Sequence, residues 1–452
     1  MLKIGFIFPS SEYLHDPFRG DPFTHFHILT ILEDTFSSAV ELKLIDLRGI
    51  KRHFAKYHIP ECDVFLHSVY TLDFAEQREI VATLRQQYPE ALHIAGGPHA
   101  NFFPDECALI FDSVIFGEGD DAIVKAIRDL GAGTLQPSYR PAGIIDINAY
   151  SYDRRHFLPK SATVRKNVLT LRRRPGLDDL NGTTAMFSRG CPYRCSFCAI
   201  EYARRETPGI RFRKPEYVEA EIEYLKKDFG IEGLALTDEI IFPLNKAAAT
   251  RHLEAIGRTN ILWRGQCRVD GVTPEIATLA RQAGCVALGM GVESVVQRCL
   301  DIINKQISIQ KARETIAMLK QNDIEARVYL IIGLPGEPDD IVEQTWRFIQ
   351  ETQPDLIYLG LFTVRPGTDV FNHPEKFGIA HIGTDWDKTM HQRRGNQENK
   401  IQLSFRYALN TPWGRGMSEE EIIRNYDELH RRIKEAGLSS FEFYKDAHIV
   451  DD

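Results

Sequence analysis

Short apolar runs alternate with longer amphipathic segments through residues 1–140 of the chain. The runs have the length of buried strands, and the segments between them place apolar residues at helical spacing. This alternation is typical of βαβ units on a parallel sheet. The strands expected are Lys3–Phe8, Glu41–Asp46, Asp63–Ser68, Leu92–Ala95 and Ser113–Phe116, with helices at Phe23–Phe36 and Leu72–Gln86.

A second series of strand–helix repeats begins at Thr183. Six βα units predict an α/β fold with a partial β/α barrel, because the eight-unit form usually needs about 250 residues. The strands expected are Thr183–Ser188, Gly233–Thr237, Ile261–Gln266, Val286–Val292, Ala326–Gly333 and Asp355–Thr363. The helices expected are Glu216–Asp228, Ala247–Ile256, Pro274–Gln282, Ile309–Lys320 and Ile341–Glu351.

Two stretches lack this periodicity. Residues 141–180 read as a linker or strap, and the run Arg172–Arg174 within them is better explained as a solvated surface than as a phosphate site. Residues 377–452 begin irregularly and then form a helix opened by the capping box Ser418–Glu421. The expected divisions are therefore 1–140, 141–180, 181–376 and 377–452, the last being a small helical region that packs on the barrel or faces substrate.

Composition and charge narrow the class of protein. The chain has 452 residues, of which 43% are hydrophobic and 26% charged, as in ordinary soluble globular proteins. The formal net charge of −8 argues against a partner nucleic acid held by a basic field. No apolar run reaches the roughly 18 residues that a membrane span needs, and the apolar start is too short for a secretion signal. We therefore expect a cytoplasmic protein with no membrane span and no nucleic-acid partner.

Turn residues follow several of the predicted strands of the first series. They include Pro9-Ser10, Gly96-Gly97-Pro98 and Gly117-Glu118-Gly119. Ligands of open α/β sheets bind at the carboxyl ends of strands, where glycine permits close approach of the backbone. The alternative is that these glycines only make tight turns.

Three of the eight cysteines form the strongest chemical signal in the chain. Cys191, Cys195 and Cys198 have CxxxCxxC spacing and follow the first strand of the second series, where a barrel places its active-site loops. A zinc site usually has four ligands in paired clusters, and no matching downstream pair exists. A 4Fe–4S cluster held by three thiolates leaves one iron open. The other cysteines are expected to be small buried hydrophobes: Cys62, Cys107, Cys267, Cys285 and Cys299.

This motif and its setting resemble the radical S-adenosylmethionine superfamily over about Thr183–Thr368. The resemblance implies that the three thiolates bind a 4Fe–4S cluster, and that S-adenosylmethionine chelates the fourth iron through its amino and carboxylate groups. One-electron reduction would then cleave the cofactor to a 5′-deoxyadenosyl radical, which abstracts hydrogen from unactivated carbon. The fold implied is a partial β/α barrel, with the protein supplying orientation and exclusion of water.

The resemblance also implies residues that bind S-adenosylmethionine. Asp238 and Glu239 at the second strand end could orient its amino group, although a helix cap is an equally good reading of Asp238. Arg268 could pair its carboxylate bidentately. Further contacts are implied for Phe197, whose alternative is loop packing, and for Glu293 and Ser294 in the stretch Gly289–Ser294.

The amino-terminal series has a second resemblance, to the Rossmann-like cobalamin-binding domain that precedes the barrel in one subgroup of the superfamily. Its loops are matched by Gly96-Gly97-Pro98-His99 and Gly117-Glu118-Gly119, and Ser68 could face the nucleotide tail of cobalamin or simply cap its strand. The DxHxxG motif that supplies a histidine ligand to cobalt is absent after the first strand. Many members of the subgroup lack it too, so cobalamin stays the expected cofactor.

Together these resemblances imply a radical S-adenosylmethionine enzyme, most simply a cobalamin-dependent methyltransferase of an unactivated carbon. The alternatives are an oxidative cyclisation, ring contraction or hydroxylation in tetrapyrrole or natural-product metabolism, and, more remotely, a non-catalytic iron–sulfur or cobalamin sensor. The implied partners are a small-molecule or natural-product substrate and an electron donor such as flavodoxin or ferredoxin. The residues that could shape the substrate pocket lie in the strap and the tail: Arg172–Leu180, Trp386, His391, Arg393, Arg394 and Trp413.

Overall fold

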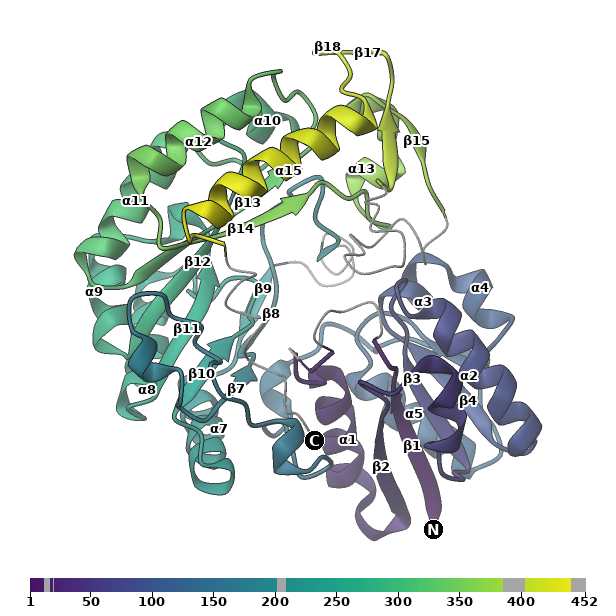
Figure 1. The fold of residues 1–452 in the computed structure, drawn as a ribbon. Coiled ribbons are helices and arrows are strands. Elements are labelled where there is room, and N and C mark those ends of the chain that lie inside the picture. Colours follow the sequence, from purple (N-terminus) through teal and green to yellow (C-terminus); the bar gives the residue numbers. More distant parts are fainter. Residues whose placement is uncertain (12–16, 19, 201–208, 385–402, 440–452) are drawn as a thin grey trace. The chain divides into compact units, whose positions relative to one another are not determined.

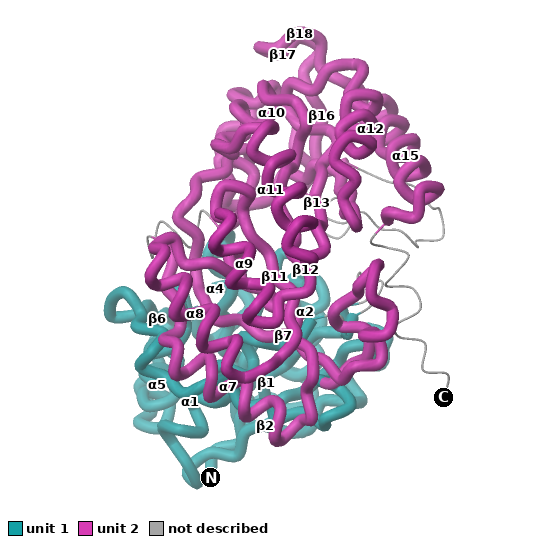
Figure 2. Tube along the Cα trace, turned by 90° about the vertical axis from the view of Figure 1, so that its left-hand side faces the viewer, with its two compact units in different colours: residues 1–163, 385–400 teal, residues 164–384, 401–452 magenta. Residues whose placement is uncertain are grey.

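A computed structural model describes residues 1–11, 17–18, 20–200, 209–384 and 403–439 of the chain. The described residues fall into two compact units (Figure 2). The first unit lies within residues 1–163, and the second comprises 164–384 together with 403–439. The finer divisions expected at residues 140, 180 and 376 remain predictions.

The first unit is built on a parallel sheet with the order β2-β1-β3-β4-β5-β6 (Figure 1). Its strands are β1 (Leu2–Phe8), β2 (Val40–Asp46), β3 (Val64–Ser68), β4 (Leu92–Gly96), β5 (Ser113–Ile115) and β6 (Ser138–Tyr139). Its α-helices are α1 (Phe23–Phe36), α2 (Phe74–Gln87), α3 (Pro98–Phe102), α4 (Pro104–Ala108) and α5 (Asp120–Gly131). The strand order reverses between β1 and β3, and such switch points are where open α/β sheets bind ligands.

Helices cover both faces of this sheet because successive side chains of each strand point to opposite faces. Ile4 packs with Leu29 of α1 and Ile123 of α5 in one cluster of buried residues. Ile7 packs with Leu84 of α2 in another. The five predicted strands are confirmed, and the unit is a doubly wound parallel sheet of Rossmann-like type.

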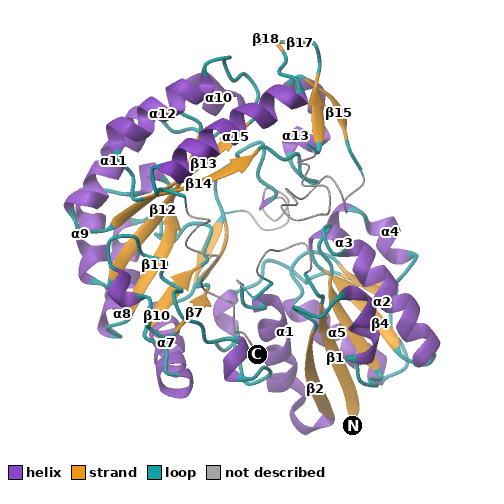
Figure 3. Cartoon of the chain, viewed as in Figure 1, coloured by secondary structure: helices purple, strands orange, loops and turns teal. Residues whose placement is uncertain are grey.

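The second unit contains a six-stranded parallel sheet with the order β14-β13-β12-β11-β10-β7. Its strands are β7 (Gly182–Ala185), β10 (Gly233–Leu236), β11 (Leu262–Cys267), β12 (Cys285–Glu293), β13 (Glu325–Ile332) and β14 (Leu356–Leu361). Helices line its outer face (Figure 3): α7 (Pro215–Phe229), α8 (Lys246–Arg258), α9 (Pro274–Gln282), α10 (Gln297–Ile302), α11 (Ile309–Gln321) and α12 (Ile341–Thr352). The predicted partial barrel is confirmed.

A short antiparallel pair, β8 (Ser188–Gly190) with β9 (Ile210–Phe212), was not predicted. Gly190 is needed there because its φ is +88° and a Cβ atom would lie 2.6 Å from the carbonyl oxygen of Gly209. This pair carries the chain from the first barrel strand into the cysteine loop.

The part of the strap that belongs to the second unit, residues 164–180, packs on the six-stranded sheet of that unit. Leu169 and Leu171 pack with Val286 and Ala287 near the start of β12. Arg327 of β13 donates from Nη2 to the carbonyl oxygens of Leu169 and Thr170, at 2.5 and 2.6 Å. These contacts close the end of the half-barrel opposite to the cysteine loop.

Two arginines of the run Arg172–Arg174, Arg173 and Arg174, pair with acidic residues of the sheet. Arg173 Nε lies 2.8 Å from an Asp355 oxygen, and Arg174 pairs with Asp323. The Glu325 carboxylate accepts from the backbone of Arg172 at 3.0 Å and Arg173 at 2.6 Å. The arginines therefore hold the strap to the starts of β13 and β14.

The C-terminal part of the described chain completes the second unit. It contains α13 (Asp369–Asn372), β15 (Ile379–Ile382), β16 (Phe405–Tyr407), β17 (Asn410–Thr411), β18 (Gly414–Arg415) and α15 (Glu419–Glu435). The capping box predicted at Ser418 and Glu421 is confirmed. Short 3₁₀ turns connect elements throughout the chain, at Ser37–Ala39, Arg52–Tyr57, Ile147–Ala149, Lys160–Ala162, Pro175–Leu177, Val269–Gly271 and Pro374–Phe377.

Candidate functional site

The cysteine loop follows β8 and is anchored at its middle to the segment after α10. The backbone N–H of Ser196 donates to the Ile303 carbonyl at 2.8 Å, and the Asn304 side chain donates to the Arg194 carbonyl at 2.7 Å. Within the loop, the Cys198 N–H donates to the Cys195 carbonyl at 3.1 Å. The loop therefore has a defined conformation held by its own protein contacts.

None of the three cysteines of the loop forms a disulfide; Cys195 is buried, and Cys191 and Cys198 are partly exposed. Burial raises the pKa of Cys198 to about 12, and its proximity to Glu239, Cys195 and Cys191 adds to the rise. Each thiolate of such a group raises the pKa of the others, because their negative charges repel. A cationic metal centre removes this repulsion and binds the thiols in their deprotonated form. The five other cysteines are buried, as predicted.

Three cysteines on one loop are a donor set that fits an iron–sulfur cluster. Within the described part of the chain, no three His, Cys, Asp or Glu side chains converge closely enough to hold one metal ion. A cluster does not require such convergence, because each thiolate binds a different iron. Three cysteines outside disulfides on one anchored loop, with no fourth cysteine in it, match a cluster that keeps one iron open.

Asp238 follows β10 and ties that strand end to β8. Its Oδ1 accepts from the backbone N–H of Phe187 at 2.8 Å and from the Ser188 hydroxyl at 2.6 Å. Its Oδ2 is buried without a hydrogen-bond partner. Burial raises the pKa of Asp238 to about 6. The alternative reading as a helix cap is not observed, since Asn245 caps the following helix α8.

Glu239, the next residue, is solvent-exposed, although desolvation by the surrounding protein raises its pKa. It lies near enough to Cys198 to affect the pKa of that thiol. The unpartnered oxygen of Asp238 and the carboxylate of Glu239, which Arg365 partly balances, therefore place acidic oxygens beside the cysteine loop. Acidic oxygens of this kind are what an amino or ammonium group of a ligand would bind.

Arg268 follows β11 and is already engaged by protein groups. It forms a bidentate pair with Asp270, in which both N···O distances are 3.0 Å. Its Nη2 also donates to the Lys305 carbonyl at 3.0 Å. Because Asp270 already occupies two N–H donors of this guanidinium, Arg268 does not offer that pair of donors to a ligand carboxylate.

Glu293 ends β12 in a strained conformation with φ +66°, where the register with β13 shifts. Its Oε1 lies 2.7 Å from the ammonium of Lys305, and both side chains are largely buried. A Cβ atom on Gly291 would lie 2.3 Å from that Oε1 and 2.8 Å from the ammonium. The glycine therefore makes room for the ion pair, and the strain at Glu293 marks a candidate functional position.

Two further predicted residues lie near this end of the sheet. Ser294 is buried next to Glu293, and its hydroxyl accepts from the Val296 N–H at 3.2 Å. Phe197 is partly buried and packs against the core of the second unit. The loop-packing reading of Phe197 therefore agrees with its contacts.

In the first unit, the predicted loop after β4 packs on the end of β3. Ser68 is buried and pairs with Gly96 across the two strands. Gly97 has φ +96°, and a Cβ atom there would lie 2.9 Å from both the nitrogen and the oxygen of Val69. Pro98 begins the short helix α3. Gly97 is thus required for contact between two loops.

His99 is fully buried in this loop and is turned into the protein. Its ring stacks on Phe74 at a centroid distance of 4.0 Å, and Nδ1 lies 3.2 Å from the Thr71 hydroxyl. Burial lowers the pKa of His99 to about 4. The imidazole is therefore neutral near pH 7 and supports the loop from inside.

The second glycine-rich turn, at residues 117–119, lies between β5 and α5. Gly117 has φ +73°, and its N–H donates to the Asn101 side chain of the neighbouring loop at 2.8 Å. Glu118 is partly exposed, and Gly119 immediately precedes α5. The structure thus brings the turns after β3, β4 and β5 to the carboxyl edge of the same sheet.

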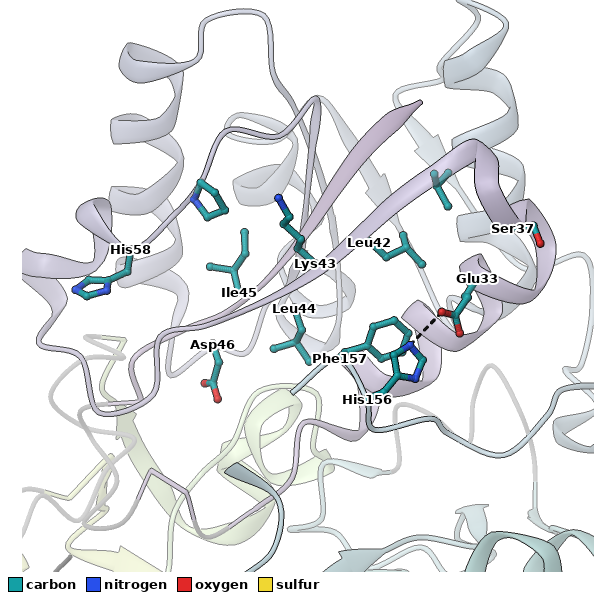
Figure 4. Close-up of a pocket in the computed structure, with 12 residues that line it drawn as sticks. Glu33, Ser37, Leu42, Lys43, Leu44, Ile45, Asp46, His58, His156 and Phe157 are labelled. Atoms are coloured by element: carbon teal, nitrogen blue, oxygen red, sulfur yellow. Dashed lines mark hydrogen bonds and ion pairs between the residues drawn. The ribbon is translucent and has the colours of Figure 1, made fainter. Parts of the chain in front are cut away.

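A hollow of the first unit lies away from these turns (Figure 4). It has a volume of about 520 Å³ and follows the edge strand β2, with Leu42, Lys43 and Leu44 among its lining residues. His156 Nε2 lies 3.0 Å from Glu33 Oε1 at its rim. Because it runs along an edge strand instead of the glycine turns, we do not assign it to the candidate site.

Several participating residues gave no usable signal in the sequence. Lys305 is buried against Glu293, twelve positions away, and Tyr193 packs under Arg268 within the cysteine motif. Asp270 could have been suspected, because it lies two residues after Arg268. Of the residues expected to shape a substrate pocket, Trp386, His391, Arg393 and Arg394 lie outside the described residues.

No helix in the described part of the chain is both long and apolar enough to span a membrane.

Comparison with known families agrees with both units. The model of the radical SAM superfamily matches residues 186–349, and the model of the B12 binding domain matches residues 29–127. Over 340 residues the chain is 27% identical to an anaerobic magnesium-protoporphyrin IX monomethyl ester cyclase of Cereibacter sphaeroides, covering 68% of this chain and 52% of the relative. It is 28% identical over 308 residues to an uncharacterized methyltransferase of Pyrococcus horikoshii, covering 62% of each.

These relatives are longer than the aligned part, since the chain spans between half and two thirds of their length. Among solved structures, the fold resembles the radical S-adenosylmethionine methyltransferase TsrM from Kitasatospora setae, whose structure contains cobalamin and a 4Fe–4S cluster. The TM-score is 0.70 at 16% identity, covering 95% of this chain and 91% of that one. This likeness concerns the fold.

Proposed function

We propose that this chain, which belongs to the radical S-adenosylmethionine superfamily and carries an N-terminal B12-binding domain, is a cobalamin-dependent methyltransferase of an unactivated carbon. One observation carries the proposal. A CxxxCxxC loop follows the first strand of a parallel half-barrel, and the same chain contains a parallel sheet with a β1/β3 switch point. The similarity to the Pyrococcus horikoshii methyltransferase supports it.

Cys191, Cys195 and Cys198 would hold the 4Fe–4S cluster. When bound, the cluster supplies the electron that cleaves S-adenosylmethionine to a 5′-deoxyadenosyl radical, and cobalamin supplies the methyl group. The loop contributes a fixed set of three thiols, because its backbone is anchored to Ile303 and Asn304. Partial exposure of Cys191 and Cys198 leaves a side from which the cluster can be approached.

Asp238 and Glu239 would orient the amino group of S-adenosylmethionine. The buried Oδ2 of Asp238 has no protein partner, so an N–H of the cofactor's amino group would supply the hydrogen bond that it lacks. Glu293, fixed through Oε1 by Lys305, would direct its other oxygen to the cofactor, with Ser294 beside it. Phe197 would pack at the edge of the same site.

Cobalamin would bind at the carboxyl edge of the first sheet, over the turns that contain Gly96-Gly97-Pro98 and Gly117-Glu118-Gly119. Ser68 and His99 would support this surface from beneath, because both are buried. An imidazole packed inside the protein does not coordinate a metal outside it. We therefore propose that His99 shapes the loop and does not ligate cobalt.

The reaction requires a small-molecule or natural-product substrate and a one-electron donor, for which a flavodoxin or ferredoxin is suitable. The test is anaerobic reconstitution with iron and sulfide, followed by absorption spectra with and without cobalamin. The reduced enzyme should form 5′-deoxyadenosine and, with substrate, S-adenosylhomocysteine. A chain that takes up neither cluster nor corrin would refute the proposal.

A matched control is available among the cysteines. The triple variant C191A/C195A/C198A should take up no cluster and cleave no S-adenosylmethionine. C62A removes a buried cysteine of the first unit and should keep both properties.

The similarity to the Cereibacter sphaeroides cyclase favours a second candidate, an oxidative cyclisation or related radical reaction without methyl transfer. The two candidates differ in their products. Methylation yields S-adenosylhomocysteine together with 5′-deoxyadenosine, and its product is heavier by one CH2 unit for each methyl group transferred. Cyclisation yields 5′-deoxyadenosine without S-adenosylhomocysteine and a different mass change.

A further inference from the structure

Arg268 lies next to a cysteine of the loop, with only 7% of its side chain exposed. Its Nη1 is 3.9 Å from the sulfur of Cys195, within the distance of an N–H···S hydrogen bond. The guanidinium carbon lies 3.5 Å from the centroid of the Tyr193 ring, a close cation–π contact. Asp270 holds the opposite edge of the guanidinium through two hydrogen bonds of 3.0 Å.

These contacts join separate parts of the chain around one thiol. Tyr193 and Cys195 belong to the cysteine loop, Asp270 follows β11, and the carbonyl of Lys305 accepts from Arg268 at 3.0 Å after α10. The guanidinium is planar and has its donors in a fixed fork, so it can serve all of these partners at once. Replacement of Arg268 would loosen the loop and remove a positive charge beside Cys195.

We infer that Arg268 is a positioning residue that orients Cys195 and makes the cluster held by the cysteine loop easier to reduce; this rests on the proposed function. Hydrogen bonds to cluster sulfurs and nearby net charge set the reduction potential of such clusters. Reduction adds negative charge, which a donor N–H and a cation beside the Cys195 sulfur stabilise. Asp270 orients the guanidinium and moderates its charge.

This role differs from the carboxylate-binding role that the sequence suggested for Arg268, and the two can be separated. A residue that only binds the carboxylate of S-adenosylmethionine has no effect on the cluster before that cofactor is added. A residue that acts through Cys195 changes the potential of the cluster in the absence of S-adenosylmethionine.

The test is a redox titration of reconstituted full-length protein without S-adenosylmethionine, followed by electron paramagnetic resonance, with iron per chain measured in parallel. In R268Q the ratio of reduced to oxidised cluster at a fixed potential should fall on the order of tenfold, that is, about 59 mV towards negative potential. R268K keeps the charge and should shift the ratio less than R268Q. The matched control R258Q breaks the exposed pair between Arg258 at the end of α8 and Glu219 of α7, and it should leave the potential unchanged.

D270N provides an independent sign test, because it removes a negative charge and leaves the guanidinium on Tyr193. Its cluster should become easier to reduce, opposite to R268Q. An R268Q protein with full iron content and an unchanged potential overturns the inference. If R268Q holds no cluster, D270N decides: a shift to positive potential supports the inference, and no shift or a negative one overturns it. Failure of the wild-type chain to take up iron would instead count against the proposed function.

Discussion

Replacing Gly97 with alanine should destabilise the first unit far more than the same change at its neighbour Gly96. Gly97 has φ +96° and ψ 179°, a region that is essentially restricted to glycine. A Cβ atom would also lie 2.9 Å from the backbone nitrogen and oxygen of Val69. Neither backbone atom can move without disturbing the end of β3.

The magnitude follows from the contacts at risk. Strain in this backbone region costs roughly 1–3 kcal/mol. Two hydrogen bonds join the loops, from Val69 N–H to the Gly96 carbonyl at 2.8 Å and from His99 N–H to the Val69 carbonyl at 3.0 Å. Each contributes about 1 kcal/mol net. The expected loss of stability in G97A is therefore about 3–5 kcal/mol.

Hydrogen exchange measured by mass spectrometry is the suitable assay, because it reports the stability of β3 and β4 separately from the second unit. In G96A the Cβ atom would meet the Ile115 carbonyl oxygen at 3.5 Å, an ordinary contact, so the loss should stay within about 1 kcal/mol. Equal exchange rates in G97A and G96A, measured without cobalamin, would show that Gly97 is not required for packing between the loops.

Three further predictions concern the second unit. K305M should lower the free energy of unfolding by about 3–5 kcal/mol in urea denaturation, because Glu293 would keep a buried charge without its partner. Adding E293Q should restore most of the loss, and a loss below about 1 kcal/mol in K305M would contradict the pairing. Burial raises the pKa of Glu337 to about 8, so the stability contributed by its protonated form is complete below pH 4.5 and is lost as the pH rises through 8. The Tm of wild type should therefore fall between pH 6 and 9 relative to that of E337Q. If the two proteins give parallel curves of Tm against pH, Glu337 is excluded as the cause. D238A should lose about 2–5 kcal/mol of the free energy of unfolding in the same urea assay, because two buried donors lose their acceptor. D238N keeps an acceptor oxygen and should lose less. Equal losses in the two variants would argue against Asp238 as the acceptor that ties the two strand ends together.

The parallel sheets could be predicted because their signal is local. A strand such as β12 is buried on both faces and therefore reads as a continuous apolar run, and the helix after it reads as a period of 3.6 residues. The hairpin of β8 and β9 escaped prediction because its three-residue strands are too short for a period to be seen. Similarly, the strap acts through carbonyl oxygens of Val168 and Leu169, which carry no side-chain signal.

The site was predictable where chemistry depends on residue type and spacing, as for the three cysteines. It was not predictable where function depends on partners distant in sequence. The arginine run was expected to be only a solvated surface, yet Arg173 binds Asp355, more than 180 positions later. Nothing in the spacing of Glu293 and Lys305 indicates that a loop will fold back and pair them.

The charges at the carboxyl end of the half-barrel indicate how S-adenosylmethionine would be oriented there under the proposed function. Arg268 is neutralised by Asp270, and Glu293 by Lys305, so neither pair carries net charge. The Oδ2 of Asp238 is without a protein partner. The N–H groups of the cofactor's amino group gain more from this carboxylate than a ligand carboxylate gains from a guanidinium that is already paired, because only the first interaction breaks no existing ion pair. The amino group of the cofactor should therefore set its orientation in this protein, and recognition of its carboxylate should fall mainly to the open iron of the cluster.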